Sequence, residues 1–298
     1  MGFDNASFIR YLSAKKSVDD RSLNPRLWSS FLGHVETMRR EGTVRIVELG
    51  AGIGSMAERI FRSVGTAGIS YVLVDENVEF LGEAERLLAK KFGHEKIDGT
   101  AEGSMGIALI AEEAGTWLSR PPQGAPFRIL LANAFLDLVD IPLVLGRAFS
   151  RLEPGGLAYL SINYDGMTDF LPALESDGEI LGHYHASMRV PKGTYSGTDK
   201  SFGRIFSFLT ENGYPILDSG SSDWVIMPRE GQENGSKYAF DEMILLSAIL
   251  SMVETSVSES ACDGALLAGW IDERRRQMER GGLGYISHQL DVLARKPY

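Results

Sequence analysis

The chain has little cysteine and a shortage of positive charge. Cys262 is the one cysteine among 298 residues, which excludes an intramolecular disulfide and any cysteine-rich metal site. The five histidines form no His-Glu-x-x-His arrangement, so we expect no metal centre. Forty Asp and Glu residues against thirty Lys and Arg give a net charge of −10, which argues against a nucleic-acid partner.

Long apolar segments are also missing. The most apolar stretch, residues 243–253, is too short to cross a bilayer. The N-terminus lacks the apolar core of a signal peptide, and Ala6 breaks the myristoylation pattern that Gly2 suggests. We therefore expect no membrane association and a cytoplasmic location. A hydrophobic content of 44% is ordinary for a globular protein of one large or two small domains.

A glycine-rich turn follows an apolar, partly β-branched strand at residues 44–49. Gly50, Gly52 and Gly54 alternate with single residues and precede a helix predicted over 55–64. Glycine lets the backbone turn sharply and approach a ligand closely, and the helix N-terminus would present its N–H groups to that ligand. A dinucleotide fingerprint, Gly-x-Gly-x-x-Gly, would need its third glycine at the position of Ser55, so the spacing does not fit that fingerprint.

The full pattern, Glu48-x-Gly50-x-Gly52-x-Gly54, resembles the first motif of the class I S-adenosylmethionine-dependent methyltransferases. The resemblance implies that this turn, with Glu48 and Ala51, approaches the amino-acid end of the cofactor. A purely steric use of glycine in a strand-to-helix turn is the structural alternative.

A second strand, predicted over residues 69–75, ends in Asp75 about twenty residues after the turn. A nucleoside-binding α/β unit places there the carboxylate that accepts hydrogen bonds from ribose. Both oxygens of a carboxylate accept, which suits a diol. Glu76 is the alternative for this role, and a solvated acid at a strand end is the structural alternative.

Two further strands end in polar residues. After the third, residues 107–111, the resemblance implies that Glu112 or Glu113 contacts the adenine amino group. After the fourth, residues 127–133, it implies that the segment with Asn133, Ala134 and Asp137 opens towards the cofactor methyl group. The structural alternative makes Asn133 a turn residue and Asp137 a helix cap. No Pro-Pro-aromatic sequence follows Asn133, which disfavours an exocyclic-amine or glutamine acceptor.

Apolar strands alternate with amphipathic helices, predicted at 55–64, 78–92 and 141–152, which favours an α/β fold with helices on both faces of a mostly parallel sheet. A fifth strand is expected at 157–163. The resemblance implies seven strands, of which the last is antiparallel. We place the sixth at 216–227 and the seventh at 285–294, where the alternating first half is typical of an edge strand.

These elements suggest an order of domains. Residues 1–43 form an N-terminal helical extension before the α/β domain at 44–298. Its polar segment 15–25, between two helices, is either a lid over the cofactor or a connector. Within the α/β domain, residues 164–200 form an acceptor-side loop and residues 229–283 a helical insertion. The insertion, with helices at 238–257 and 264–280, is a cap or the surface of a homodimer.

The predicted function is methyl transfer from S-adenosylmethionine to a small-molecule acceptor, by in-line displacement at the sulfonium methyl. An O, N or C nucleophile that carries a proton would need a general base, and the candidates are His183, His185 and Tyr164. His288 lies within a predicted strand and is interpreted as a packed histidine. The alternatives are an NAD(P)-dependent oxidoreductase, which the glycine spacing disfavours, and a catalytically silent methyltransferase-like binding protein.

Overall fold

The structure is a computed structural model that describes residues 4–93, 106–122, 125–189, 191–192, 195–196, 198–231 and 235–298. The chain divides into two compact units. The sheet unit comprises Leu23–Asn163, Ser201–Ser222 and Leu290–Tyr298, and the helical unit comprises Met1–Ser22, Tyr164–Lys200 and Asp223–Gln289. Each is described by itself.

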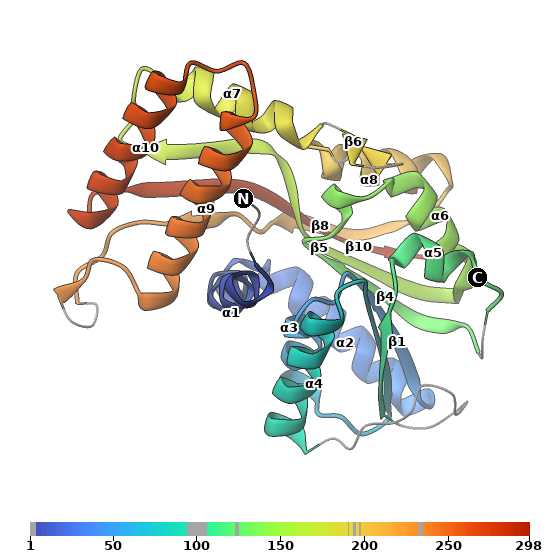
Figure 1. The fold of residues 1–298 in the computed structure, drawn as a ribbon. Helices are drawn as coiled ribbons and strands as arrows, with labels where there is room; N and C mark the ends of the chain where they lie inside the picture. The colour runs from blue at the N-terminus through green and yellow to red at the C-terminus, as the bar shows by residue number, and fades with distance from the viewer. Residues whose placement is uncertain are drawn as a thin grey trace. The chain divides into compact units, whose positions relative to one another are not determined.

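One sheet carries the strands of the sheet unit (Figure 1). Its strands run in the order β3-β2-β1-β4-β5-β10-β8, and the pairs from β3 to β5 are parallel, while β8 and β10 are antiparallel. The bounds are β1 Val44–Leu49, β2 Ile69–Asp75, β3 Gly106–Ala111, β4 Phe127–Asn133, β5 Leu152–Leu171, β8 Ile216–Ser221, β9 Trp224–Ile226 and β10 Gly284–Arg295. The predicted mostly parallel α/β class is confirmed.

The described residues form a sheet of eight strands instead of the predicted seven. The difference arises because the segment predicted as the sixth strand forms two strands, β8 and β9. β8 ends at Ser221 and β9 begins at Trp224, and β9 pairs with β10 in the helical unit. β10 lies between β5 and β8, so the prediction of an edge strand was wrong. The alternating pattern that suggested an edge comes from Tyr285 to Asp291 of β10, where buried and half-buried side chains do alternate.

Helices cover both faces of the sheet, since successive strand residues point to opposite faces. One face packs against α5 Ala114–Ser119, α6 Ile141–Arg151 and α8 Ser201–Glu211, with Val47, Leu49 and Leu160 among its buried strand residues. The other face carries Tyr71 and Tyr159, which contact Phe61 of α3 Ser55–Val64 and Phe31 of α2 Pro25–Glu41. α4 Val78–Phe92 packs against α3 and β2.

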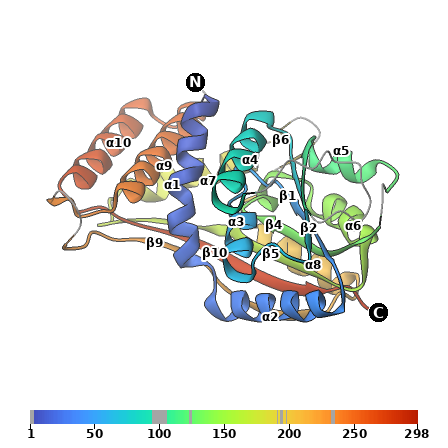
Figure 2. The same cartoon turned by 90° about the horizontal axis from the view of Figure 1, so that it is seen from below.

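Helix α2 begins at an Asn-Pro pair, which is typical of a helix start. Asn24 is its N-cap and accepts a hydrogen bond from the Leu27 amide at 3.2 Å, and Pro25 occupies the first helical position. Figure 2 shows α2 running along the sheet, where its Phe31 ring stacks on Tyr159 with centroids 4.9 Å apart. The apolar side of this helix is therefore part of the core of the sheet unit.

The polar segment 15–25 is not an extended connector. Helix α1, Asn5–Ser22, continues through most of it. Lys15 and Asp19, which are both buried, form an ion pair at 2.5 Å one helical turn apart, and Asp19 also accepts from the Trp224 indole at 3.0 Å. The ion pair within the helix and the bond from Trp224, which is distant in sequence, hold a polar stretch in helical form.

Residues 164–200 are more ordered than a loop. β5 continues to Leu171, and its buried Phe170 contacts the rings of Trp270 and Tyr285. Helix α7, Asp177–Met188, follows, and then the short paired strands β6 Pro191–Lys192 and β7 Tyr195–Ser196. The sequence has little periodicity here because α7 buries few of its side chains, Ile180 and Leu181.

The helical unit is organised around α9, Phe240–Ser258, which contacts α1, α7 and α10 Gly264–Glu279. Contact with three helices explains why α9 is apolar nearly all round. Its buried side chains are Glu242, Leu245, Leu246, Ala248, Ile249, Leu250, Val253 and Val257. No helix among the described residues is both long and apolar enough to span a membrane.

Candidate functional site

In the glycine turn between β1 and α3, every second residue has a backbone conformation that favours glycine. The φ angles of Gly50, Gly52 and Gly54 are 63°, 52° and 74°, all in the left-handed region. A Cβ on Gly50 would lie 2.2 Å from Cδ2 of Phe135, and one on Gly54 would lie 3.0 Å from Cβ of Ala84. Packing as well as conformation therefore requires glycine at positions 50 and 54.

Backbone hydrogen bonds fix the shape of this turn. The Ala51 amide donates to the Val74 carbonyl at 3.1 Å, and the Gly54 amide donates to the Ala51 carbonyl at 2.9 Å. Gly54 is the N-cap of α3, and no described side chain caps this helix end. The first turn of α3 therefore keeps amide groups and a positive dipole end that suit an anionic ligand.

Asp75 lies next to the turn, as its spacing predicts. Its Oδ2 accepts from the Gly52 amide at 2.7 Å and its Oδ1 accepts from the Asn77 amide at 2.9 Å. Burial raises the pKa of this carboxyl, and the two amide bonds only partly oppose that rise. Each carboxylate oxygen has a second lone pair, so Asp75 keeps acceptor capacity for a ligand hydroxyl. Glu76, the alternative, is exposed.

Glu48 lies in the core. Its side chain is buried, and Oε2 accepts a hydrogen bond from the Tyr71 hydroxyl at 2.6 Å. Burial raises the pKa of Glu48 to about 8, although the Tyr71 bond and the charge of Arg59 act in the opposite direction. Glu48 thus has an internal partner on the face of the sheet that carries α3, and its contact with a cofactor stays a prediction.

The two acids after β3 have different surroundings. Glu113 caps α5, since its carboxylate accepts from the Gly115 and Thr116 amides at 2.7 and 2.5 Å. Burial alone would raise the pKa of Glu113, but these bonds outweigh it and the pKa is lowered. Glu112 donates its amide to the Asp75 carbonyl at 3.0 Å and pairs with Arg120 at 2.6 Å. Because Glu113 is engaged as a cap, Glu112 is the stronger candidate for a ligand contact.

The segment after β4 is strained. Ala134 has a φ of 50°, and its amide donates to the Ser161 carbonyl at 2.9 Å, while the Ser161 hydroxyl donates to Oδ1 of Asn133 at 2.8 Å. Asp137 lies in the 3₁₀ turn Leu136–Leu138. The interpretation of Asp137 as a helix cap was wrong, because Asp140 caps α6 through the Leu143 amide at 3.0 Å.

Phe135 is the residue of this site that sequence reasoning missed. Its ring lies over Gly50 so closely that even a methyl group there would collide with it. Phe135 follows the end of β4 by two residues, and no local pattern distinguishes it from other apolar residues. The contact arises only because β4 and β1 are neighbours in the sheet.

The strand register brings the candidates together at one edge of the sheet. Leu49, the last residue of β1, pairs with Val74 of β2 and Ala132 of β4. The glycine turn, Asp75 and Asn133 each follow these paired residues directly. In parallel sheets, ligands bind at the carboxyl ends of the strands, so this edge is the candidate cofactor site.

The candidates for a general base lie in the helical unit. Tyr164 Oη is 2.8 Å from Nε2 of His185 and 3.0 Å from the Thr168 hydroxyl. Burial lowers the pKa of His185, which favours the neutral ring at neutral pH. His288 is not an isolated packed ring, because its Nδ1 lies 2.9 Å from Oδ1 of Asp223.

His183 and His185 lie on α7 and not on an extended loop. Two residues are about 200° apart around a helix, so the two rings still point in different directions. His185 faces Tyr164, whereas His183 lies close to Glu179 and Cys262. The structure therefore brings His185 and Tyr164 together and separates His183 from them.

No protein-family profile matches the sequence, and no curated protein matches it either. Solved structures of methyltransferases resemble the structure remotely. One is a Galdieria sulphuraria protein provisionally assigned as a sarcosine dimethylglycine methyltransferase, with 16% identity over 90% of this chain and 84% of that chain and a TM-score of 0.46. Another, magnesium protoporphyrin IX methyltransferase from Synechocystis PCC 6803 with bound S-adenosylmethionine, is 12% identical over 74% of this chain and 79% of that one, with a TM-score of 0.42.

A third structure is Haemonchus contortus phosphoethanolamine N-methyltransferase 2 with phosphomonomethylethanolamine and S-adenosylhomocysteine. It is 16% identical over 86% of this chain, with a TM-score of 0.44, and the match spans 49% of that enzyme. Likeness at this level concerns the fold alone. The strand order and register themselves define a mostly parallel α/β fold, and the activity depends on the site described above.

Proposed function

We propose that this chain binds S-adenosylmethionine at the carboxyl edge of β1, β2 and β4 and transfers its methyl group to a small molecule. The observation that carries the proposal is the register, which places the glycine turn, Asp75 and Asn133 immediately after paired residues of adjacent strands. The acidic charge of the chain, −10, disfavours a polyanionic acceptor.

The residues of the site would each bind a different part of the cofactor. The turn 50–54 and the open first turn of α3 suit the amino-acid end, whose carboxylate is favoured at a helix N-terminus. Asp75 suits the ribose hydroxyls and Glu112 the adenine amino group. We assign Asn133 and the strained Ala134 to the methyl end. The bound cofactor supplies an activated methyl group, and the protein orients the acceptor and excludes water.

Tyr164 and His185 are the acceptor-side pair that we propose for proton removal, should the nucleophile carry a proton. The unprotonated nitrogen of a neutral His185 ring accepts a hydrogen bond from the Tyr164 hydroxyl, and it can accept one from a ligand hydroxyl in the same way. Replacement of His185 by Ala should lower kcat with little change in cofactor affinity. An unchanged kcat across the pH range would exclude the pair from proton transfer.

Calorimetry with S-adenosylhomocysteine, S-adenosylmethionine and NAD(H) tests the cofactor. The substitution Asp75→Asn should weaken binding of both adenosyl compounds by about 10–100-fold, the cost of a hydrogen bond to a charged group. Glu76→Gln, its exposed neighbour, is the matched control and should leave the affinity unchanged. Binding of NAD(H) in place of the adenosyl compounds would refute the proposal.

A second pair of experiments separates an enzyme from a silent binding protein. Gly52→Val should abolish cofactor binding while the chain stays folded, because the new side chain would project into the turn. Transfer of a labelled methyl group to a panel of small acceptors then tests turnover. Binding without transfer to any acceptor would favour the silent alternative.

Four predictions concern the rest of the chain. Closure of residues 1–43 over the cofactor is testable by proteolysis with and without S-adenosylhomocysteine. The acceptor-side role of residues 164–200 is testable by substitution within α7. A homodimer formed through the helices of 229–283 is testable by sedimentation. The cytoplasmic location is testable by fractionation of cells.

A further inference from the structure

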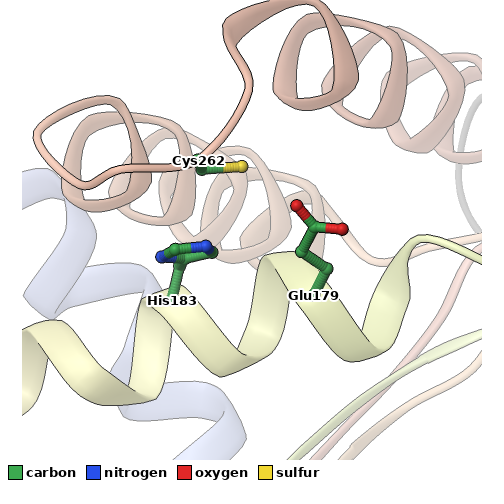
Figure 3. Close-up of side chains that lie close together, drawn as sticks. All are labelled: Glu179, His183 and Cys262. Atoms are coloured by element: carbon green, nitrogen blue, oxygen red, sulfur yellow. The ribbon is translucent and has the colours of Figure 1, made fainter.

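Three side chains of different ligand chemistry converge in the helical unit, and none of them is among the residues assigned to the cofactor. They are Glu179, His183 and Cys262, and their ligand atoms, one from each side chain, all lie within 4.8 Å of one another. Figure 3 shows Glu179 and His183 projecting from α7 towards Cys262. A carboxylate, an imidazole and a thiol form a set of metal ligands and not a typical packing cluster.

The two ligands on α7 are separated by four residues. This spacing places them on one face of a helix, one turn apart, so the fold of α7 alone brings them together. Glu179 is exposed and His183 is half-buried, so the carboxylate can change rotamer to approach an ion while the ring is more restricted.

Cys262 comes from the loop between α9 and α10, which has a defined backbone. The Cys262 amide donates to the Ser260 hydroxyl at 3.2 Å, and that hydroxyl donates to the Val257 carbonyl at 2.7 Å. Asp263, the next residue, caps α10 through the Ala265 amide at 2.7 Å, which makes it a cap and not a fourth ligand. The loop therefore presents the sulfur of Cys262 to α7.

Cys262 lies near the negative charges of Glu179 and Asp263. The pKa of the thiol is raised by burial and by the negative charges of Glu179 and Asp263. A divalent ion reverses this effect, because it attracts the carboxylate and stabilises the thiolate as a ligand.

We propose that Glu179, His183 and Cys262 form a zinc site that fastens the α9–α10 loop to α7. Zinc accepts sulfur, nitrogen and oxygen ligands in tetrahedral geometry, at about 2.0–2.3 Å, and with three protein ligands it keeps a fourth position for water. Bonds of that length need ligand atoms about 3.3–3.8 Å apart. Small rotamer changes would bring the three ligand atoms from within 4.8 Å of one another to these distances. Binding replaces the thiol proton with the metal and releases that proton to solvent.

The prediction of no metal centre rested on sequence spacing alone. Cys262 is 79 positions from His183, and no short metal-binding pattern connects them. The contact between α7 and α9 brings the loop that follows α9 to this place.

The test uses the full chain, stripped with a chelator and titrated with Zn²⁺ against a chromophoric competitor. One Zn²⁺ per chain should bind, with an affinity that rises with pH and a higher midpoint of thermal unfolding. Co²⁺ in place of Zn²⁺ should give a thiolate-to-metal charge-transfer band in the near ultraviolet. Cys262→Ser should abolish the band.

Variants locate the site. Cys262→Ser and His183→Ala should each weaken Zn²⁺ binding by more than about 100-fold. Even the loss of a residue that only hydrogen-bonds a metal ligand costs about 10–100-fold in affinity. Glu175→Gln, an exposed acid outside the cluster, and His34→Ala, a histidine of the sheet unit, are the controls and should leave the affinity unchanged. Zn²⁺ binding that persists in both cluster variants, or that is absent from the unaltered chain, would overturn the proposal.

Discussion

The contact between Gly50 and Phe135 permits a quantitative test of the glycine turn. In a Gly50→Ala variant, the new Cβ would lie 2.2 Å from Cδ2 and 2.5 Å from Cγ of the Phe135 ring. Such distances require the ring to move, which costs about 1–3 kcal/mol in a packed region. The φ of 63° adds about 1–2 kcal/mol for a residue with a Cβ. We expect a loss of about 2–5 kcal/mol in the free energy of unfolding.

A matched control separates the two contributions. Gly93, at the C-terminal end of α4, has a φ of 66° and a ψ of 31° in the left-handed region, but a Cβ there would meet no atom within 4 Å. Gly93→Ala should therefore cost only the conformational part, about 1–2 kcal/mol. In a Phe135→Ala background the ring atoms are gone, and only the Cβ of residue 135, at 2.9 Å, still crowds the new methyl group. The double variant should therefore recover most of the packing cost, about 1–3 kcal/mol, relative to the sum of the single losses.

Urea unfolding, followed by far-ultraviolet circular dichroism and tryptophan fluorescence, measures these differences. If Gly50→Ala costs no more than Gly93→Ala, or if the double variant shows no coupling, the ring does not lie over the turn as the structure places it. S-adenosylhomocysteine binding by the double variant then reports whether the turn itself still accepts the cofactor.

The remaining predictions concern buried charge. The folded-state pKa of Glu48, about 8, exceeds the unfolded value of 4.5, so the folded chain holds its proton more tightly and stability falls as pH rises from about 4.5 to 8. Glu48→Gln should remove this dependence of stability on pH, which amounts to at most about 5 kcal/mol across that range. If the urea midpoint of the variant depends on pH as that of the unaltered chain does, the effect is excluded. Buried Asp291 accepts from the Ile162 amide at 2.8 Å, and Asp291→Ala should cost about 2–4 kcal/mol by leaving its donors unpaired, whereas no loss on urea unfolding would contradict this. Arg274 is fully buried and pairs with Asp177 at 2.5 Å, so Arg274→Met should cost about 3–5 kcal/mol in the same assay, and a neutral or stabilising result would show that packing replaces the pair.

Local signals in the sequence predicted much of the sheet unit. Buried parallel strands need continuous apolar runs, and a helix start needs a side-chain cap, so β1, β2, β4 and the Asn24 cap of α2 were recognisable. The alternating glycines and Asp75 were identified for the same reason. Their role depends on backbone conformation and on distance along the chain, and both can be read from the local sequence.

Predictions that depended on partners distant in sequence were less successful. Residues 164–200 seemed irregular because their periodicity is weak, although Phe170 and α7 pack against other elements of the helical unit, Trp270 and α9. β10 seemed an edge strand because alternation in a sequence does not reveal a second neighbour. The role of Glu113 as a cap was equally hidden, since a helix as short as α5 leaves almost no pattern.

The sequence by itself determined the glycine turn and its neighbour: three glycines in one register and an acid at the end of the next strand, each fixed by local stereochemistry. Only the tertiary structure placed Phe135 over Gly50, paired Tyr164 with His185, and gathered Glu179, His183 and Cys262. Those groupings join residues from separate elements. The packing of the whole chain decides them, because no local conformational preference connects residues so far apart.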